Sequence, residues 1–330
     1  MALRVSCAAL AMAAMWMAPL SAPALAQDAG EAAATVQWVT LGTRGGPVAS
    51  DTRSQPANLL VVDGMNYLVD AGDGTAGQLA KAGLPTAAIA AVFISHLHFD
   101  HTAGLAGLLG LRWQTNAPRP LVVYGPPGTE DMVEGLVASM VPGTTAGYGV
   151  PGATERNPAD EVRVVELRDG ESVAVGAMRV TVRNNTHYSF AAESGLADRF
   201  ESLSFRFDTP TRSIVYTGDT GPSPAVEDLA RGADLLVAEM MDVEFTVAAV
   251  RRNSPNLPPH IASEMESHLR GHHLVPADVG AMASRAGVGA LVVTHFVGLE
   301  PGEDGHLAYL RTIAESYDGP AVIAGDLERF

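Results

Sequence analysis

The chain has 330 residues, of which 47% are hydrophobic and 18% charged, so it can bury the core of one large domain. Its formal net charge is −16, and its longest run of basic residues is the pair Arg251 and Arg252, which disfavours a nucleic-acid partner. The single cysteine, Cys7, excludes a disulfide framework.

The first 26 residues predict a cleavable secretory signal peptide. Arg4 precedes an apolar run that ends at Pro19, and small residues follow as far as the sequence ALA before Gln27. The apolar run is too short to span a bilayer, which argues against an uncleaved membrane anchor. We therefore expect a periplasmic or secreted protein without a membrane span, whose mature part, residues 27–330, is one domain without a thiolate ligand.

Short apolar runs bounded by Gly, Pro and Asp predict strands, and runs with helical spacing predict helices. Strands are expected at 35–42, 58–64 and 65–72 (a hairpin around Gly64), 90–95, 120–125, 162–167, 172–176, 178–184, 202–209, 213–219, 233–239, 290–295 and 320–325. Helices are expected at 74–84, 102–113, 128–140 (with Thr129 as N-cap), 225–230, 276–287 and 306–317. Segments 141–160 and 240–270 are expected to be loops. The pattern predicts a layered α/β fold with helices outside two packed sheets.

The stretch FISHLHFDHTAG, residues 93–104, concentrates metal-capable side chains directly after a buried strand. His96, His98 and Asp100 alternate, and alternate side chains at a strand end share a face. A turn at Phe99 and Asp100 would bring Asp100 and His101 to a neighbouring point. One loop could therefore serve two adjacent metal ions.

Further candidate ligands come just after other β-like runs. His187 follows MRVTVRNNT, Asp219 follows SIVYTG, and His295 follows ALVVT. Strand ends at one edge of a sheet are where α/β proteins collect functional groups. These nitrogen and oxygen donors suit Zn²⁺ and would also accept Mn²⁺ or iron.

These residues carry a family resemblance. SHLHFDH resembles the H-x-H-x-D-H signature of the metallo-β-lactamase fold, and LVDAGDG, with Asp70, resembles the motif whose aspartate supports the site from behind. The resemblance implies a four-layer αβ/βα sandwich with two zinc ions at one edge. It assigns the ligands as His96, His98 and His187 for one ion, Asp100, His101 and His295 for the other, and Asp219 as the bridge. Such a pair lowers the pKa of a shared water toward about 7, so that metal-bound hydroxide attacks an ester-type substrate.

The resemblance also indicates a branch. β-Lactamases of this fold usually lack a bridging aspartate at the position of Asp219. GPPGTEDMVEGL and HHLVPADVGAMASRAGVGALVVTHF are more similar to the ribonuclease Z and arylsulfatase-like branch. There a histidine heads an H-[ST]-x-x-[DE] segment and approaches the scissile group. His273 matches it by position, although Leu274 and Val275 replace the polar pair, and Asp100 and His273 are the candidate catalytic residues.

Ribonuclease Z carries a long tRNA-binding arm between the motifs that correspond to His187 and Asp219, and here that span is too short for one. We therefore expect a small-molecule ester substrate, namely a sulfate ester, a phosphodiester or a lactone, and no nucleic-acid partner. The alternatives are a β-lactamase-like amide hydrolase and a non-catalytic metal-binding module, and a homodimer remains open. His272 is expected to be a polar neighbour of the site, whereas His260, His268 and His306 are expected at the surface.

Overall fold

A computed structural model describes residues 35–147, 149, 156–299 and 305–330. The predicted signal peptide, residues 1–26, lies outside the described residues. In the described part of the chain, no helix is both long and apolar enough to cross a membrane.

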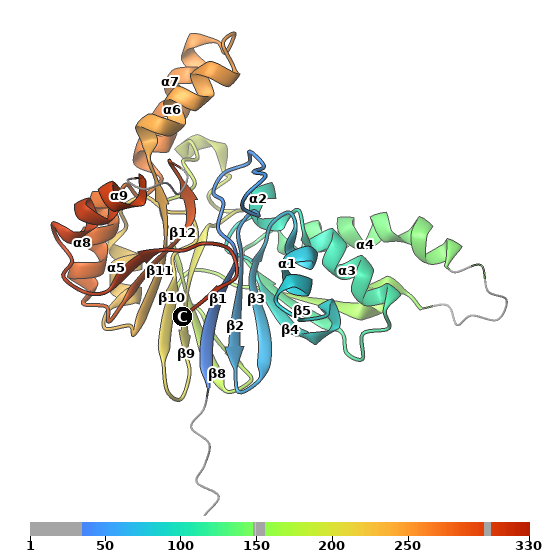
Figure 1. Cartoon of the computed structure of the whole chain (residues 1–330). Coiled ribbons are helices and arrows are strands. Elements are labelled where there is room, and N and C mark those ends of the chain that lie inside the picture. The colour runs from blue at the N-terminus through green and yellow to red at the C-terminus, as the bar shows by residue number, and fades with distance from the viewer. Residues whose placement is uncertain (1–34, 148, 150–155, 300–304) are drawn as a thin grey trace, which may run out of the picture. The chain divides into compact units, whose positions relative to one another are not determined.

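Strands of the described residues form two seven-stranded sheets (Figure 1). The first sheet has, in spatial order, β14 (Glu328–Arg329), β1 (Val36–Gly42), β2 (Ala57–Val62), β3 (Met65–Ala71), β4 (Ile89–Phe93), β5 (Leu121–Gly125) and β6 (Val162–Glu166). The second has β13 (Ala321–Ile323), β12 (Leu291–Val297), β11 (Leu235–Met241), β10 (Ser213–Tyr216), β9 (Leu203–Asp208), β8 (Met178–Asn184) and β7 (Ser172–Val175). The β3–β4–β5–β6 and β10–β11–β12–β13 pairings are parallel, and the others are antiparallel.

Helices lie on the outer faces of both sheets (Figure 1). The helices of the first half are α1 (Thr75–Lys81), α2 (Phe99–Thr102), α3 (Leu105–Gln114) and α4 (Thr129–Ala146). Those of the second half are α5 (Pro224–Ala230), α6 (Val243–Asn253), α7 (Pro259–Gly271), α8 (Pro276–Ala286) and α9 (Gly305–Ala314). Short 3-10 helices occur at Thr86–Ala88, Pro158–Glu161 and Ala192–Ser194.

Three apolar layers hold this arrangement together. The central layer lies between the sheets, where Trp38, Phe93 and Phe207 are fully buried and the Phe93 and Phe207 rings meet edge to face with centroids 5.3 Å apart. One outer layer lies under α1, α3 and α4, and the other under α5, α8 and α9. The predicted four-layer sandwich is therefore confirmed, as is the hairpin around Gly64, where Val62 pairs with Met65.

Two predicted features need correction. The first is the helix over 128–140 and the loop after it. Gly128, with φ 95°, is the N-cap in place of Thr129, and the Glu166 carboxylate accepts hydrogen bonds from the N–H groups of Gly128 and Glu130. The helix also continues through Pro142 to Ala146, because its apolar side packs against the outer layer of the first sheet. The expected loop at 141–160 is thus partly helical, and residues 148 and 150–155 of it are not described.

The second correction concerns segment 240–270, which is helical and not a loop. Asp242 caps α6 by accepting a hydrogen bond from the N–H of Phe245 at 2.9 Å, and α7 begins at Pro259. No residue of α7 is fully buried, but Ile261, Met265 and Leu269 recur at the i, i+4, i+8 spacing of a helix, so the sequence does carry a signal for it. Figure 1 shows α6 and α7 rising together beyond the end of β11.

Candidate metal centre

One short loop supplies four of the candidate side chains. After β4 the chain reaches His98, which occupies the N-cap position of the single-turn helix α2. His96 is fully buried, whereas His98 is exposed. The turn of α2 carries Asp100 and His101 back toward His96, so that the His96 and His101 ring centroids are 4.1 Å apart. The expected turn is thus one helical turn.

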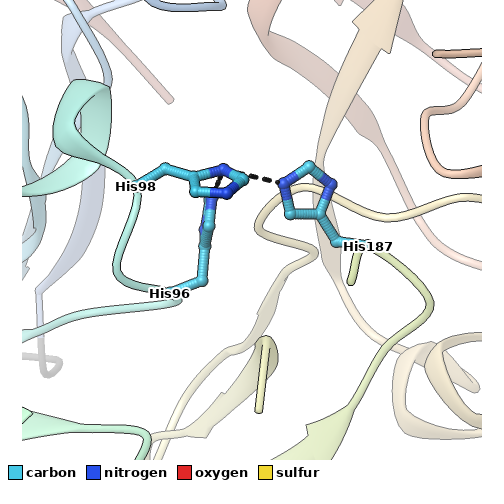
Figure 2. Close-up of side chains that lie close together, drawn as sticks. All are labelled: His96, His98 and His187. Atoms are coloured by element: carbon cyan, nitrogen blue, oxygen red, sulfur yellow. Dashed lines mark hydrogen bonds between the residues drawn. The ribbon is translucent and has the colours of Figure 1, made fainter. Parts of the chain in front are cut away.

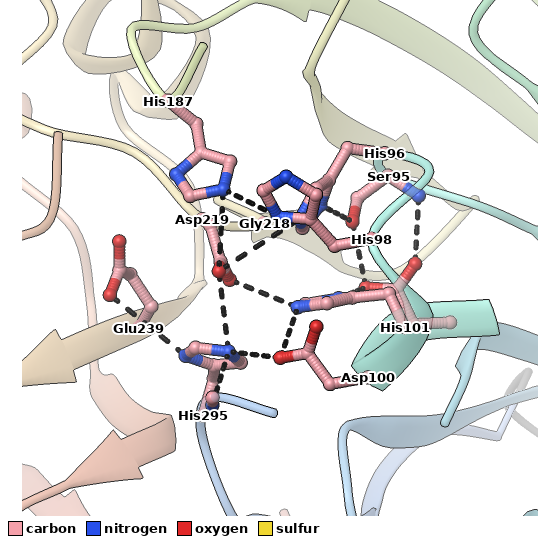
Figure 3. A network of polar contacts seen from close by, with 12 residues as sticks. Ser95, His96, His98, Asp100, His101, His187, Gly218, Asp219, Glu239 and His295 are labelled. Carbon is pink, nitrogen blue, oxygen red and sulfur yellow. Dashed lines mark hydrogen bonds and ion pairs between the residues drawn. The ribbon is translucent and has the colours of Figure 1, made fainter. Parts of the chain in front are cut away.

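Three other segments contribute one side chain each. His187 follows β8, Asp219 follows β10, and His295 lies within β12. His295 has φ 42°, a left-handed backbone that non-glycine residues rarely adopt. A Cβ on the adjacent Gly45 would lie 2.7 Å from the His295 carbonyl oxygen, so only glycine fits there. Figure 3 shows all seven predicted ligands pointing toward one region.

The first group of side chains contains only histidines. Figure 2 shows the rings of His96, His98 and His187 converging. His98 Nδ1 lies 3.1 Å from His96 Nε2 and 3.1 Å from His187 Nε2. One ring nitrogen of each lies within 4.8 Å of the others, which is a spacing that one ion can fill.

The second group contains Asp100, His101 and His295. Asp100 Oδ2 lies 3.6 Å from His101 Nε2 and 3.5 Å from His295 Nε2. Asp219 stands between the two groups, since its oxygens lie 3.3 Å from His101 Nε2, 3.3 Å from His295 Nε2 and 3.9 Å from His96 Nε2. The structure therefore brings together every predicted ligand, in the two predicted sets.

Unpartnered buried atoms point to a cation in this region. His101 Nε2 and Asp219 Oδ1 face each other at 3.3 Å, yet neither has a hydrogen-bond partner among the described residues. Buried polar atoms without partners are costly, and a divalent ion would satisfy both atoms at once. The donor set of imidazoles and carboxylates suits zinc, so the residues fit the metal that the sequence predicts.

The histidines of the first group are neutral at pH 7. Burial holds the pKa of His96 well below its ordinary value, and the nearby His101 and His187 lower it further. Burial likewise lowers the pKa of His187 to about 3, and partial desolvation of the His98 ring where it packs against His96 and His187 lowers the pKa of His98. A neutral imidazole keeps a lone pair for a metal ion.

In the second group, opposite charges on neighbouring side chains outweigh the effect of burial on the pKa values. Burial would lower the pKa of His101, but the carboxylates of Asp219, Asp70 and Asp100 raise it well above its ordinary value. Burial would raise the pKa of Asp100, yet His101 and His295 bring it down to about 2. The carboxylates thus favour positive charge here, which a metal ion can supply in place of a proton.

Asp70 supports His101 from behind. Its Oδ2 lies 2.8 Å from His101 Nδ1 and accepts hydrogen bonds from Tyr216 Oη at 2.7 Å and Ser95 Oγ at 2.8 Å, while its Oδ1 accepts one from the Ser95 N–H at 2.7 Å. Asp70 itself has φ 59°, a strained conformation that this network holds. With Nδ1 engaged by Asp70, the Nε2 of His101 faces the centre.

His273 lies beside the predicted ligands and is held by a buried carboxylate. Its Nδ1 lies 3.0 Å from both oxygens of Glu239. Burial would lower the pKa of His273, but Glu239 raises it to about 9. Its ring centroid is 5.0 Å from that of His187 and 6.4 Å from that of His295. The next residue, Leu274, is fully buried in the apolar layer under α8, which explains why a polar residue is absent there.

Glu239 and Tyr216 contact the site but are not among the predicted residues, and His268 lies nearer to the site than predicted. Glu239 ends the apolar run ADLLVAE, which is the same signal that identified Asp219. His268 was expected at the surface, but it is half-buried with its ring centroid 5.4 Å from that of His187. No local pattern could have placed it, because it reaches the site only through the packing of α7.

Two sheets flanked by helices, with imidazoles and carboxylates converging at one edge, define a metallohydrolase of the metallo-β-lactamase fold. The family model of the β-lactamase superfamily domain matches residues 65–296. The chain therefore belongs to the β-lactamase superfamily.

Individual relatives agree with this family. The chain is 31% identical over 265 residues to ribonuclease Z from Mycobacterium marinum, covering 79% of this chain and 86% of that protein. The metallo-β-lactamase fold protein YhfI from Bacillus subtilis superposes with a TM-score of 0.63 at 17% identity, and human tRNase Z, short form, with 0.59 at 24% identity. Each alignment covers 89% of this chain and 98% of the other, and at these identities both support the fold alone. The predicted enzyme class, a metal-dependent hydrolase acting on ester bonds, is confirmed.

Proposed function

We propose that this chain is an exported dinuclear metal-dependent hydrolase of a small ester-type substrate. The observation that carries the proposal is the convergence of seven metal-capable side chains, among which the buried atoms His101 Nε2 and Asp219 Oδ1 have no hydrogen-bond partner among the described residues. We assign one ion to His96, His98 and His187, the second to Asp100, His101 and His295, and the bridging position to Asp219.

Zinc is the metal that this set of donors favours, and Mn²⁺ and iron are the alternatives. When bound, two such ions supply hydroxide near neutral pH and offset the negative charge that develops on the ester. The protein's part is to hold neutral imidazoles toward the first ion and a charge-balanced carboxylate pair toward the second.

His273 and Asp100 are the groups that we assign to proton handling. Because Glu239 engages Nδ1 of His273, its Nε2 is the ring nitrogen left for the substrate. From there His273 would donate a proton to the leaving oxygen or stabilise its charge. Asp100 Oδ2, which lies 3.5 Å from His295 Nε2, can orient the attacking water by accepting its hydrogen bond.

The reacting bond that we favour is a phosphodiester, because the curated relative is named ribonuclease Z. RNA itself is disfavoured in this chain. Between His187 and Asp219 the described residues form a loop that contains the 3-10 helix Ala192–Ser194, followed by β9 and β10, and they form no separate arm. The acidic net charge also opposes a long polyanion. A small diester, with a sulfate ester or a lactone as alternatives, fits these features.

Export is the remaining part of the proposal. It rests on the pattern of Arg4, the apolar run and the small residues before Gln27, and it implies a periplasmic or secreted enzyme. N-terminal sequencing of the secreted protein should give Gln27 as the first residue, and retention of Met1 would contradict cleavage.

The function can be tested with the zinc-loaded protein and a panel of substrates. The panel should include bis(4-nitrophenyl) phosphate, 4-nitrophenyl sulfate, an acyl-homoserine lactone and a cephalosporin, each assayed with Zn²⁺, Mn²⁺ and Fe²⁺. We expect turnover of the phosphodiester that a chelator abolishes and that added metal restores. Turnover of the cephalosporin alone would favour a β-lactamase-like enzyme, and metal binding without any turnover would favour a non-catalytic module.

A further inference from the structure

An aromatic strip leads away from the first metal group. We define it as Tyr188, Phe190 and Phe200, which belong to the segment between β8 and β9. The ring centroids of Tyr188 and Phe190 are 4.8 Å apart, and those of Phe190 and Phe200 are 6.4 Å apart. The proton-transfer and metal-binding roles assigned above use none of these three side chains.

The inner end of the strip contacts the predicted ligands. The Tyr188 ring centroid lies 5.4 Å from that of His98, 5.7 Å from that of His187 and 5.9 Å from that of His96. Its hydroxyl accepts a hydrogen bond from the Leu97 N–H at 3.1 Å, which fixes the ring beside the metal-binding loop. Tyr188 is therefore the part of the strip that lies beside the first metal group.

The strip is only half-buried, which distinguishes it from the core aromatics nearby. Phe205 and Phe207, a few residues further along the chain, are fully buried between the sheets. Phe190 and Phe200 instead keep part of each ring exposed. The guanidinium of Arg199 lies over the Phe200 ring, 5.1 Å from its centroid, and helps hold the outer end in place.

A row of partly exposed rings that starts at a reaction centre suits an apolar group of the substrate. Aromatic faces bind flat apolar groups through area burial and ring–ring contact. Resting on the proposed function, we infer that the strip is a subsite for an aryl or similarly apolar arm of the ester.

The first test compares two diesters with the same leaving group. Bis(4-nitrophenyl) phosphate and methyl 4-nitrophenyl phosphate both release 4-nitrophenol, and only the retained arm differs. Because the second 4-nitrophenyl group also activates the phosphorus, the informative quantity is how the kcat/KM ratio of the two diesters changes on mutation, and we expect the ring contact to contribute about fivefold to tenfold to that ratio. Phe190→Ala should lower this ratio by about fivefold to tenfold relative to the wild type, and Phe190→Leu should restore part of it.

The second test measures binding without turnover. Phenylphosphonate and methylphosphonate share the group that would approach the metal, and calorimetry can compare their affinities for the zinc-loaded protein. We expect phenylphosphonate to bind several-fold more tightly, and Phe190→Ala to bring the two affinities together. This readout separates the two proposals, because a strip that binds phenyl groups in a protein that hydrolyses no ester would leave the subsite standing and refute the enzyme.

Phe330→Ala is the matched control, since Phe330 is also a half-buried phenylalanine but packs against the layer between the sheets. It should retain the wild-type preference for the aryl arm and for phenylphosphonate. The subsite proposal is wrong if Phe190→Ala lowers kcat/KM equally for the two diesters and affinity equally for the two phosphonates. It is also wrong if the variant keeps the wild-type preference for the aryl compound in both assays, or if the wild type has no such preference in either assay. Zinc content, measured in every variant, should stay at the wild-type value.

Discussion

The two halves of the candidate metal centre are built differently. The first group consists of three neutral histidines, and one of them, His98, faces solvent. The second group contains the carboxylate of Asp100, is buried throughout, and has His101 engaged by Asp70. One half of the centre is therefore open and uncharged, and the other is closed, charge-balanced and supported from behind.

This difference indicates which parts of the fold hold each of the two proposed ions. The second group is positioned by side chains from both sheets, since Asp70 lies in β3 and Tyr216 ends β10. The first group depends on the loop after β4 and on the loop that holds His187, whose Nδ1 lies 3.2 Å from the His272 carbonyl oxygen at the end of α7. We expect the second ion to bind more tightly and the first to exchange more readily.

Asp219→Ala should have the largest effect, because Asp219 reaches both halves. Loss of the bridging carboxylate leaves the two cations to repel each other across the gap. Activity should fall by more than the 10–100-fold that loss of a supporting residue typically causes, and metal content should fall with it. Steady-state kinetics and elemental analysis of the same preparation check this. Full occupancy with wild-type activity would contradict the bridging assignment.

His273→Ala should lower kcat by about 10²–10⁴, the usual range for general acid–base catalysis, while both metals remain bound. His273 contacts the centre without being assigned to a metal, so activity and metal content should separate in this variant. A substrate with a better leaving group should recover part of the loss. If metal content fell as far as activity, His273 would instead be a ligand or a structural residue.

Asp70→Asn should weaken metal binding in the second half of the centre more than in the first. It removes the carboxylate that engages Nδ1 of His101, and loss of such partners typically weakens metal binding about 10–100-fold. Competition with a chromogenic chelator should show one site weakened and the other nearly unchanged. Equal weakening of both sites would mean that the halves are not independently supported.

His98→Ala should have the smallest effect on the fold. Because His98 is exposed, its removal from the metal-free protein should change the free energy of unfolding by no more than about 0.5 kcal/mol. His101→Ala, by contrast, breaks a fully buried pair with Asp70 and should cost about 3–5 kcal/mol. Urea denaturation of both variants without metal tests this. Similar losses in both would show that burial does not distinguish the two groups.

The sequence predicts the layers and the convergence of the seven metal-capable side chains because both depend on local patterns. Apolar runs ending in His96, Asp219 or His295 identify a strand and the polar group at its end. The supporting groups were harder to find, since Tyr216 and Glu239 matter only through contacts with distant segments. The helical spacing of Ile261, Met265 and Leu269 does indicate α7, whereas the position of α7, and with it that of His268, depends on packing that no local pattern encodes.

The central claim is most directly tested by titrating the metal-free protein with zinc while following hydrolysis of bis(4-nitrophenyl) phosphate. The two ligand sets joined by Asp219 predict that activity rises until two equivalents of zinc per chain are bound and then stays constant. Saturation at one equivalent, or activity that does not depend on metal, would contradict a dinuclear centre.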